Sequence, residues 1–264
     1  MGGMLQADLS LQEDYFMSSK ETAKYVSTSL AICVVGASII YAQEKVDHSL
    51  FTKVLKEHVV DGAVDYAAIK TDKRFGKYLE VLAGTDPSTI KDDNERLAFW
   101  INAYNAFTIQ LINDHYPVKS IRDIKKEGVG PWDFVWIPIG GKKYSLNQIE
   151  HEIIRKEFDE PRIHMALVCA AVSCPPLRSE AYEGRKLAAQ LDDNSRRFLF
   201  DTSKNRYDKT TNTLYLSELF SWYGADFVKT YGSAENFALV VLGLSDVKPA
   251  AIKYLPYDWN LNAG

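Results

Sequence analysis

The sequence predicts an α+β fold, in the form of a helix-rich single domain with a buried central helix packed on a small mixed or antiparallel sheet. The first observation is a stretch without Gly or Pro, residues 97–115, whose middle is apolar nearly all round, as in a helix inside a core. The second is a set of short hydrophobic runs separated by turn residues. Neither an internal repeat nor a long Pro/Gly/Ser linker divides residues 43–264, which indicates one domain.

The N-terminal part of the sequence has the pattern of an export signal. Lys20 and Lys24 precede a short apolar stretch, residues 30–40, and the small residue Ala42 follows it. This order of features is typical of a signal peptide. Because small and polar residues interrupt the stretch, it falls short of the ~20 apolar residues of a membrane span. An uncleaved N-terminal anchor is the alternative interpretation.

We therefore expect residues 1–42 to be a leader and residues 43–264 to be a single globular domain. Met17 opens the signal pattern and is the expected true start, with cleavage after Ala42. Such a leader would send the protein to the periplasm or outside the cell, with no stable membrane span after cleavage.

Charge and cysteine content exclude some classes of protein. The net charge is −4, and residues 1–42 hold four acidic and two basic side chains, so about −2 remains after cleavage. The basic residues are interspersed rather than clustered, which argues against a nucleic acid partner. Only Cys169 and Cys174 remain in residues 43–264, so the fold does not depend on a framework of disulfides.

Helical periodicity predicts two helices, residues 47–60 and 73–82, before the central one. Asp92 and Glu95 have the spacing of a capping box at the start of the central helix. Pro117 ends that helix, since the residue before a proline is disfavoured in helical geometry.

The chemistry-bearing residues follow the central helix. Ser145 and Gln148 form a second capping box, which opens a helix over residues 146–158. Residues 162–168 are predicted to form a buried strand that leads into a cysteine-containing turn. The other predicted elements are strands at residues 134–139 and 142–144 around a Gly-Gly turn, a helix at 185–200, a hairpin at 206–216, helices at 218–230 and 234–242, and a closing segment at 254–262.

Four motifs occur in a fixed order at residues 97–107, 146–151, 164–175 and 254–259. Together they resemble the family called domain of unknown function 547, over nearly the whole of residues 51–262. The resemblance implies a protein that stands alone in bacteria and is often exported. In plants and animals it implies fusion to other modules, including glutaredoxin-like and leucine-zipper regions. It implies no particular reaction.

Cys174 is the first candidate for a catalytic residue, because it lies between Ser173 and Pro175 just after a predicted strand. A cysteine nucleophile needs a cation or an imidazole that lowers its pKa from ~8.5. His164 and His151 are the candidate bases, and Glu150 and Asn102 are candidate groups to orient them. The alternative is that Cys174 is a small buried residue and that His164 is a core histidine.

Glu150 and His151 are neighbours on a predicted helix, where adjacent side chains point about 100° apart. We therefore expect at most one of them to contact a substrate directly. Arg155 stands where a zinc-protease helix would carry its second histidine. The sequence predicts no metal and no cofactor.

A disulfide between Cys169 and Cys174 is a rival to the catalytic thiol, since exported proteins meet oxidising conditions. Five residues in extended form span roughly 16 Å, whereas a disulfide needs Cα atoms about 4.4 to 6.8 Å apart. We therefore favour a strand that ends near Cys169 and leaves the two cysteines unpaired.

Two functions remain open. The first is a thiol-dependent hydrolase or acyl/amide transferase with a Cys-His centre, acting on a small-molecule or peptide substrate. The second is a non-catalytic binding or scaffold module of the cell envelope.

Overall fold

The longest element of the fold is α5 (Asp93–His115), and most of its side chains are buried. The computed structural model describes residues 45–264, of which Val46–Gly264 form one unit; the predicted leader lies outside the described residues. The Asp92 side chain accepts a hydrogen bond from the Glu95 amide and begins the helix. The helix ends before Pro117, which follows Tyr116 through a cis peptide bond. The predicted central helix is thus confirmed. Its neighbours include the helices α3 (Tyr66–Thr71), α4 (Lys73–Gly84) and α7 (Leu187–Leu199), the π-helix η3 (Gln148–Ile154) and the 3₁₀ turn η5 (Gly184–Lys186).

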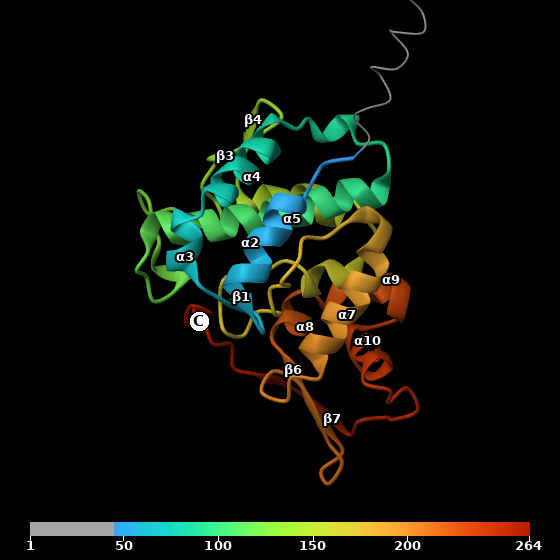
Figure 1. Ribbon diagram of the computed structural model, residues 1–264. Helices are drawn as coiled ribbons and strands as arrows, with labels where there is room; N and C mark the ends of the chain where they lie inside the picture. Colours follow the sequence, from blue (N-terminus) through green and yellow to red (C-terminus); the bar gives the residue numbers. More distant parts are fainter. Residues whose placement is uncertain (1–44) are drawn as a thin grey trace, which may run out of the picture. The chain divides into compact units, whose positions relative to one another are not determined.

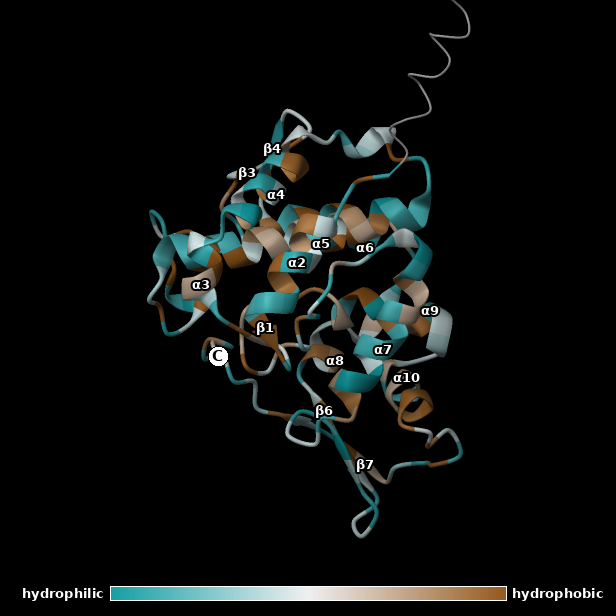
Figure 2. Ribbon diagram, in the orientation of Figure 1, coloured by the Kyte–Doolittle hydropathy of each residue, from teal (hydrophilic) through white to brown (hydrophobic). Residues whose placement is uncertain are grey.

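In the part of the chain that the structure describes, three helices and a small hairpin precede α5; α3 and α4 pack on α5, and α2 packs on α3 and α4 (Figure 1). These elements are α2 (Ser49–His58), β1 (Val59–Val60), β2 (Ala63–Val64), α3 (Tyr66–Thr71), α4 (Lys73–Gly84) and the short turn η1 (Pro87–Thr89). Asp65 and Asp72 cap α3 and α4, because each side chain accepts a hydrogen bond from a first-turn amide. Figure 2 shows hydrophobic residues along much of α5, as expected of an element in the core.

The segment after α5 contains a turn and a second hairpin, η2 (Ile121–Asp123), β3 (Ile137–Ile139) and β4 (Lys142–Tyr144). The predicted Gly140-Gly141 turn is confirmed, with φ values of 57° and 76° that favour glycine. Gly140 also lies against the main chain of Thr85, where a Cβ atom would come within 3.1 Å of the carbonyl oxygen. A larger residue there would push the hairpin away from the end of α4.

The predicted capping box is confirmed, since the Ser145 hydroxyl accepts from the Gln148 amide and the Gln148 side chain accepts from the Ser145 amide. The helix that it opens begins as a π-helix, η3 (Gln148–Ile154), and continues as α6 (Arg155–Glu157). The π-helical form was not predicted. Such turns are rare and frequent at functional sites.

The predicted strand at residues 162–168 is wrong, because the chain there forms a 3₁₀ turn, η4 (Pro161–Met165). Pro161 has a fixed φ that suits the first position of a turn, and the Glu160 side chain accepts a hydrogen bond from the Arg162 amide. The residues are nevertheless buried, including His164. Burial made a strand and a tight helical turn look alike in the sequence.

The C-terminal part forms a second hydrophobic cluster around a three-stranded sheet. Its elements are η5 (Gly184–Lys186), α7 (Leu187–Leu199), β5 (Arg206–Asp208), β6 (Thr213–Ser217), α8 (Leu219–Trp222), η6 (Gly224–Phe227), α9 (Val228–Tyr231), α10 (Ala234–Val241) and β7 (Ala251–Leu255). The β5–β6 hairpin is antiparallel as predicted, whereas β7 pairs with β6 in parallel and makes the sheet mixed. The helix predicted at residues 218–230 is divided into three short pieces.

After β7 the chain returns toward β1, as Figure 1 shows. The amides of Val172 and Ser173 donate to the carbonyls of Asn260 and Asp258, and the Val64 amide donates to Asn262. The last residues are therefore fixed to the loop that carries the two cysteines. Within residues 45–264, no helix combines the length and hydrophobicity that a membrane span requires.

Candidate functional site

A cavity of about 260 Å³ lies where five parts of the fold meet: α5, η3, η4, the end of α8 and the C-terminal segment. Six aromatic side chains line it, namely Tyr104, Trp132, Trp222, Tyr223, Tyr257 and Trp259. Three of the predicted site residues also line it, namely Glu150, His151 and His164, together with Cys169, which was not among them. The volume is slightly below the roughly 300–1,000 Å³ that small-molecule sites occupy.

The aromatic wall is a continuous cluster. The rings of Trp222, Tyr257 and Trp259 lie within 4.6 to 5.9 Å of one another, centroid to centroid. Trp132 extends the cluster, since its ring meets that of Trp259 edge to face at 5.7 Å. These separations are typical of favourable aromatic pairs, so the rings hold one another in place around the cavity.

Glu150 is buried, with 6% of the residue exposed, although it is an acidic side chain. The hydroxyls of Tyr104 and Tyr223 are hydrogen-bonded to it. Burial, together with the negative charge of Glu150, raises the pKa of both phenols well above their ordinary value. The phenols therefore stay protonated and donate to the Glu150 carboxylate at neutral pH.

His151 also lines the cavity, so Glu150 and His151 both reach it, and the expectation that at most one of them contacts a substrate directly stays a prediction. The His151 Nδ1 atom lies 3.9 Å from a Glu150 carboxylate oxygen. Both residues are in the π-helix η3, in which neighbouring side chains diverge less than in an α-helix. Arg155 Nη1 donates to Nδ1 of His151 over 3.1 Å, so this nitrogen is the acceptor in that hydrogen bond.

His164 is paired with Asp226, a residue that the sequence did not suggest. The Nε2 atom of His164 lies 2.7 Å from Asp226 Oδ2, and the ring stacks on Tyr223 at 4.0 Å. Arg155 donates to both oxygens of the same carboxylate. Partial burial raises the pKa of Asp226, but the hydrogen bonds from His164 and Arg155 outweigh it and lower the pKa below its usual range. Asp226 is thus ionised and orients His164.

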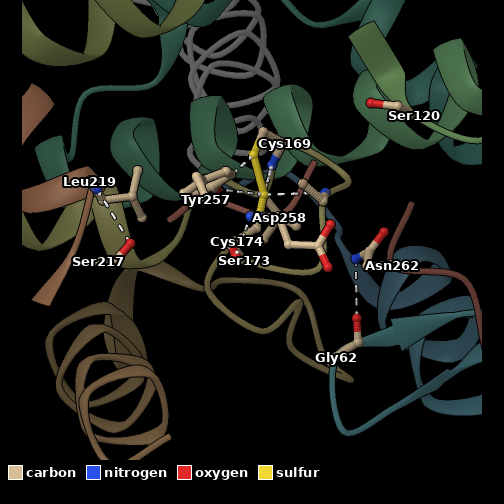
Figure 3. Close-up of a disulfide and its surroundings, with 12 residues drawn as sticks. Gly62, Ser120, Cys169, Ser173, Cys174, Ser217, Leu219, Tyr257, Asp258 and Asn262 are labelled. Atoms are coloured by element: carbon tan, nitrogen blue, oxygen red, sulfur yellow. Dashed lines mark hydrogen bonds between the residues drawn. A yellow bond between two sulfur atoms is a disulfide. The ribbon is translucent and has the colours of Figure 1, made fainter. Parts of the chain in front are cut away.

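The two cysteines form a disulfide, with Cα atoms 6.1 Å apart, so the expectation that they are unpaired is wrong. The intervening residues are not extended: Ala170 has a φ of 60°, and the Cys174 amide donates to the Ala171 carbonyl. This tight turn brings the sulfurs together. Figure 3 shows the Tyr257 side chain beside them, with its hydroxyl 3.2 Å from Cys169 Sγ and 3.3 Å from Cys174 Sγ.

The disulfide changes which cysteine faces the site. Cys169 lines the cavity, whereas Cys174 is 2% exposed and lies against a different hollow beside Gly62. A sulfur in a disulfide has no thiolate form, so Cys174 is not a nucleophile in this state. Its catalytic role therefore remains a prediction, and only for a reduced form of the protein.

Asn102 lies away from the cavity and holds the main chain of another segment. Its amide donates to the Tyr182 carbonyl and accepts from the Tyr182 amide. Asn105 does the same with Ala166 and Val168. These bonds occupy both the donor and the acceptor of the Asn102 side chain, and the structure does not bring Asn102 to the predicted histidines.

Among the described residues, one group could offer ligands to a metal: Glu57, His58 and Asp72. Arg74, however, lies between the two acids, and its Nη2 atom is 2.5 Å from each carboxylate. The guanidinium already neutralises the charge that a cation would need there.

Sequence reasoning missed Asp226, Trp222 and Tyr223. A signal was present in the run Trp222-Tyr223 near Asp226, because clustered aromatics beside an acid in a turn are more common at sites than on plain surface. The Tyr257 and Trp259 side chains lie in a motif that the sequence marked without assigning it a role. Nothing in the sequence indicated that these segments meet.

The fold and cavity define a helix-rich α+β protein with an aromatic cavity. Residues 87–199 match the family described as "Protein of unknown function, DUF547". This match confirms the resemblance over the central helix and the segments of Glu150, His164 and Cys174. The match does not extend to Tyr257 and Trp259. Comparisons with curated proteins and with solved structures gave no significant match.

Proposed function

We propose that this protein binds a small molecule in the aromatic cavity. The observation that carries the proposal is the convergence of aromatic walls with Glu150, His151 and His164 in one cavity. An apolar pocket with a few convergent polar groups is the usual form of a small-molecule site. The proposal favours the binding-module alternative of the sequence analysis over the thiol enzyme.

The polar groups also suit proton exchange with a bound molecule. An imidazole changes charge near neutral pH, and a carboxylate oriented by hydrogen bonds can accept a proton. His164 is held by Asp226, which fixes the ring and its tautomer. Any reaction at the oxidised site would therefore be acid–base chemistry by Glu150 and the two histidines.

Binding can be tested by calorimetry, in which small cations, anions and neutral ring compounds are each titrated into the protein. We expect at least one class to bind to the native protein and not to Trp222→Ala. Phe200→Ala is the matched control, because Phe200 is also a half-exposed aromatic residue (55% against 47%) but does not line the cavity. If both variants bind equally well, the cavity is not the site.

A thiol-dependent hydrolase or acyl transferase is the second candidate, with Cys169 rather than Cys174 as its nucleophile. Two observations favour it: Cys169 lines the cavity, and His164 is oriented by Asp226 as a general base would be. A dithiol reductant must first pass two electrons and two protons to the disulfide, which yields two thiols and oxidises the reductant. The thiolate would then attack a carbonyl, and the imidazolium would protonate the leaving group.

Alkylation by iodoacetamide after reduction tests this candidate. In Cys174→Ser, where Cys169 is the only described thiol, we expect fast labelling at a pH below the ordinary thiol pKa of ~8.5. His164→Gln in the same background should slow the reaction. Labelling at the rate of a free thiol in both variants would rule out an activated cysteine and leave the binding function alone.

We further propose that the protein works outside the cytoplasm. The signal pattern of residues 1–42 supports this proposal, and so does the disulfide, since such bonds persist mainly in oxidising compartments. Mass analysis of the protein from fractionated cells is expected to find a chain that starts at Gln43. A full-length chain in the cytoplasm with reduced cysteines would contradict export.

A further inference from the structure

We infer that the ligand of the aromatic cavity is a small organic cation, such as a quaternary ammonium or alkylamine. This inference rests on the proposed binding function and names the chemical class that the site accepts. Two independent features carry it: the charge of the lining and the number of aromatic rings in it.

The first feature is an unbalanced negative charge. Among the described residues that line the cavity, none is a lysine or an arginine, and Glu150 is the one acidic member. Arg155 lies nearby, but its Nε and Nη2 atoms donate to Asp226 over 2.6 and 2.7 Å. The charges of Arg155 and Asp226 therefore largely offset each other. Within the described residues, no lysine or arginine lies within ion-pair distance of the Glu150 carboxylate, and His151, whose Nδ1 lies 3.9 Å from it, accepts a hydrogen bond from Arg155 on that nitrogen.

The hydrogen bonds from Tyr104 and Tyr223 stabilise the charge of Glu150 without neutralising it. A carboxylate that is 6% exposed has lost most of its hydration. An ion in such surroundings gains most from a partner of opposite charge. A bound cation would supply it.

The second feature is the aromatic wall. The face of an aromatic ring attracts a cation, and tryptophan does so most strongly. Three of the six lining rings are tryptophans, Trp132, Trp222 and Trp259. Two of the six already hold an arginine of the protein: Arg155 lies over Tyr223 at 5.2 Å, and Arg122 over Trp259 at 5.3 Å. The rings thus accept cations where the chain itself provides them.

Other ligand classes fit the lining less well. An anion would meet Glu150 and the negative faces of the rings with no lysine or arginine to hold it. A neutral ring compound would fill the aromatic space but leave the buried carboxylate unpaired, at a desolvation cost. The cavity of about 260 Å³ also limits the ligand to a compact head group.

The test uses three probes of nearly equal shape and different charge. The cation is choline, the neutral probe is its carbon isostere with a tert-butyl group in place of trimethylammonium, and the anion is the corresponding carboxylate. Calorimetric titration is done at about pH 8, above the ordinary range of imidazole protonation. We expect choline to bind about tenfold or more tightly than the neutral isostere and the anion not to bind.

Two substitutions assign the preference to the site. Glu150→Gln keeps the shape of the side chain and should reduce the preference for choline over the isostere, whereas Glu152→Gln, at an exposed neighbouring position, should leave it unchanged. Trp222→Ala is a second variant at a half-exposed residue and should weaken choline more than the isostere. It keeps the test decisive if Glu150→Gln fails to fold.

The outcomes separate the two proposals. Equal affinity for choline and the isostere would overturn the cation inference and leave the binding function standing. Tighter binding of the anion would do the same. If none of the three probes binds to the native protein, the binding function and the cation inference are overturned together.

Discussion

Two regions of the molecule bury polar side chains, and they use them differently. On α5, the amides of Asn102 and Asn105 are saturated by main-chain groups of other segments. At the cavity, Glu150 and His151 lie on η3 with part of their surface toward open space. The first region shows that a buried side-chain amide whose donor and acceptor are both hydrogen-bonded to the main chain stabilises the fold. The second shows that a buried polar group facing a cavity is available to a ligand.

We expect the largest loss of stability from a substitution at Asn102. In Asn102→Ala, the Tyr182 amide and carbonyl lose their partners inside the core. Each buried unsatisfied group costs about 1–3 kcal/mol, so we expect urea denaturation to show a loss of several kcal/mol. Asn236→Ala, at an exposed position, should change stability little. If Asn102→Ala instead weakened ligand binding without loss of stability, Asn102 would belong to the site as first predicted.

The disulfide joins the two regions, and its removal is expected to have the next largest effect. The loop between Cys169 and Cys174 pairs with Asp258 and Asn260, next to the aromatic residues Tyr257 and Trp259. Closing so short a loop stabilises by about 2 kcal/mol. The double variant Cys169→Ser with Cys174→Ser should lose that stability and also bind ligand more weakly. A stability loss with unchanged affinity, measured on the folded protein, would show that the loop does not hold the cavity wall.

Much of the fold could be predicted from local pattern. The central helix, both capping boxes and the Gly140-Gly141 turn depend on residues close together in the chain, such as Ser145 with Gln148. The strand expected at residues 162–168 was wrong because burial alone does not separate a strand from a 3₁₀ turn that Pro161 begins. The parallel pairing of β7 with β6 was also missed, since it joins residues far apart in sequence.

The site was predictable only in part, for the same reason. His164, His151 and Glu150 were identified and do line one cavity. Asp226 stands 62 positions after His164, and no local rule relates the two. Cys169 and Cys174 depend on the turn at Ala170, whose φ of 60° is unusual for a residue other than glycine. Long-range pairs and rare backbone angles are what a single sequence does not reveal.

The Asp226 carboxylate gives the second region a pH dependence that the first lacks. Its pKa is lower in the folded protein than in the unfolded chain, where it is about 3.9. Its contribution to stability is therefore complete above the unfolded value and is lost as pH falls through the lowered folded value. Denaturation from about pH 6 downward should show Asp226→Asn less stable than wild type, with a difference that shrinks below about pH 4. A constant difference would mean that the carboxylate is not stabilised by its charge.

We expect the smallest changes in stability from the removal of single tyrosine hydroxyls in the two regions. The Tyr223 hydroxyl is hydrogen-bonded to Glu150, whereas the Tyr182 hydroxyl is buried without a hydrogen-bond partner. Tyr223→Phe should therefore cost about 1 kcal/mol of stability and change ligand affinity. Tyr182→Phe removes a polar group that gains nothing from the fold, so its stability should be unchanged or slightly higher. Thermal unfolding and choline titration of both variants provide the check. Equal losses of stability in the two variants would mean that the hydrogen bond to Glu150 does not distinguish Tyr223 from Tyr182. The contrast between polar groups that stabilise the fold and polar groups that face the cavity would then not hold for these side chains.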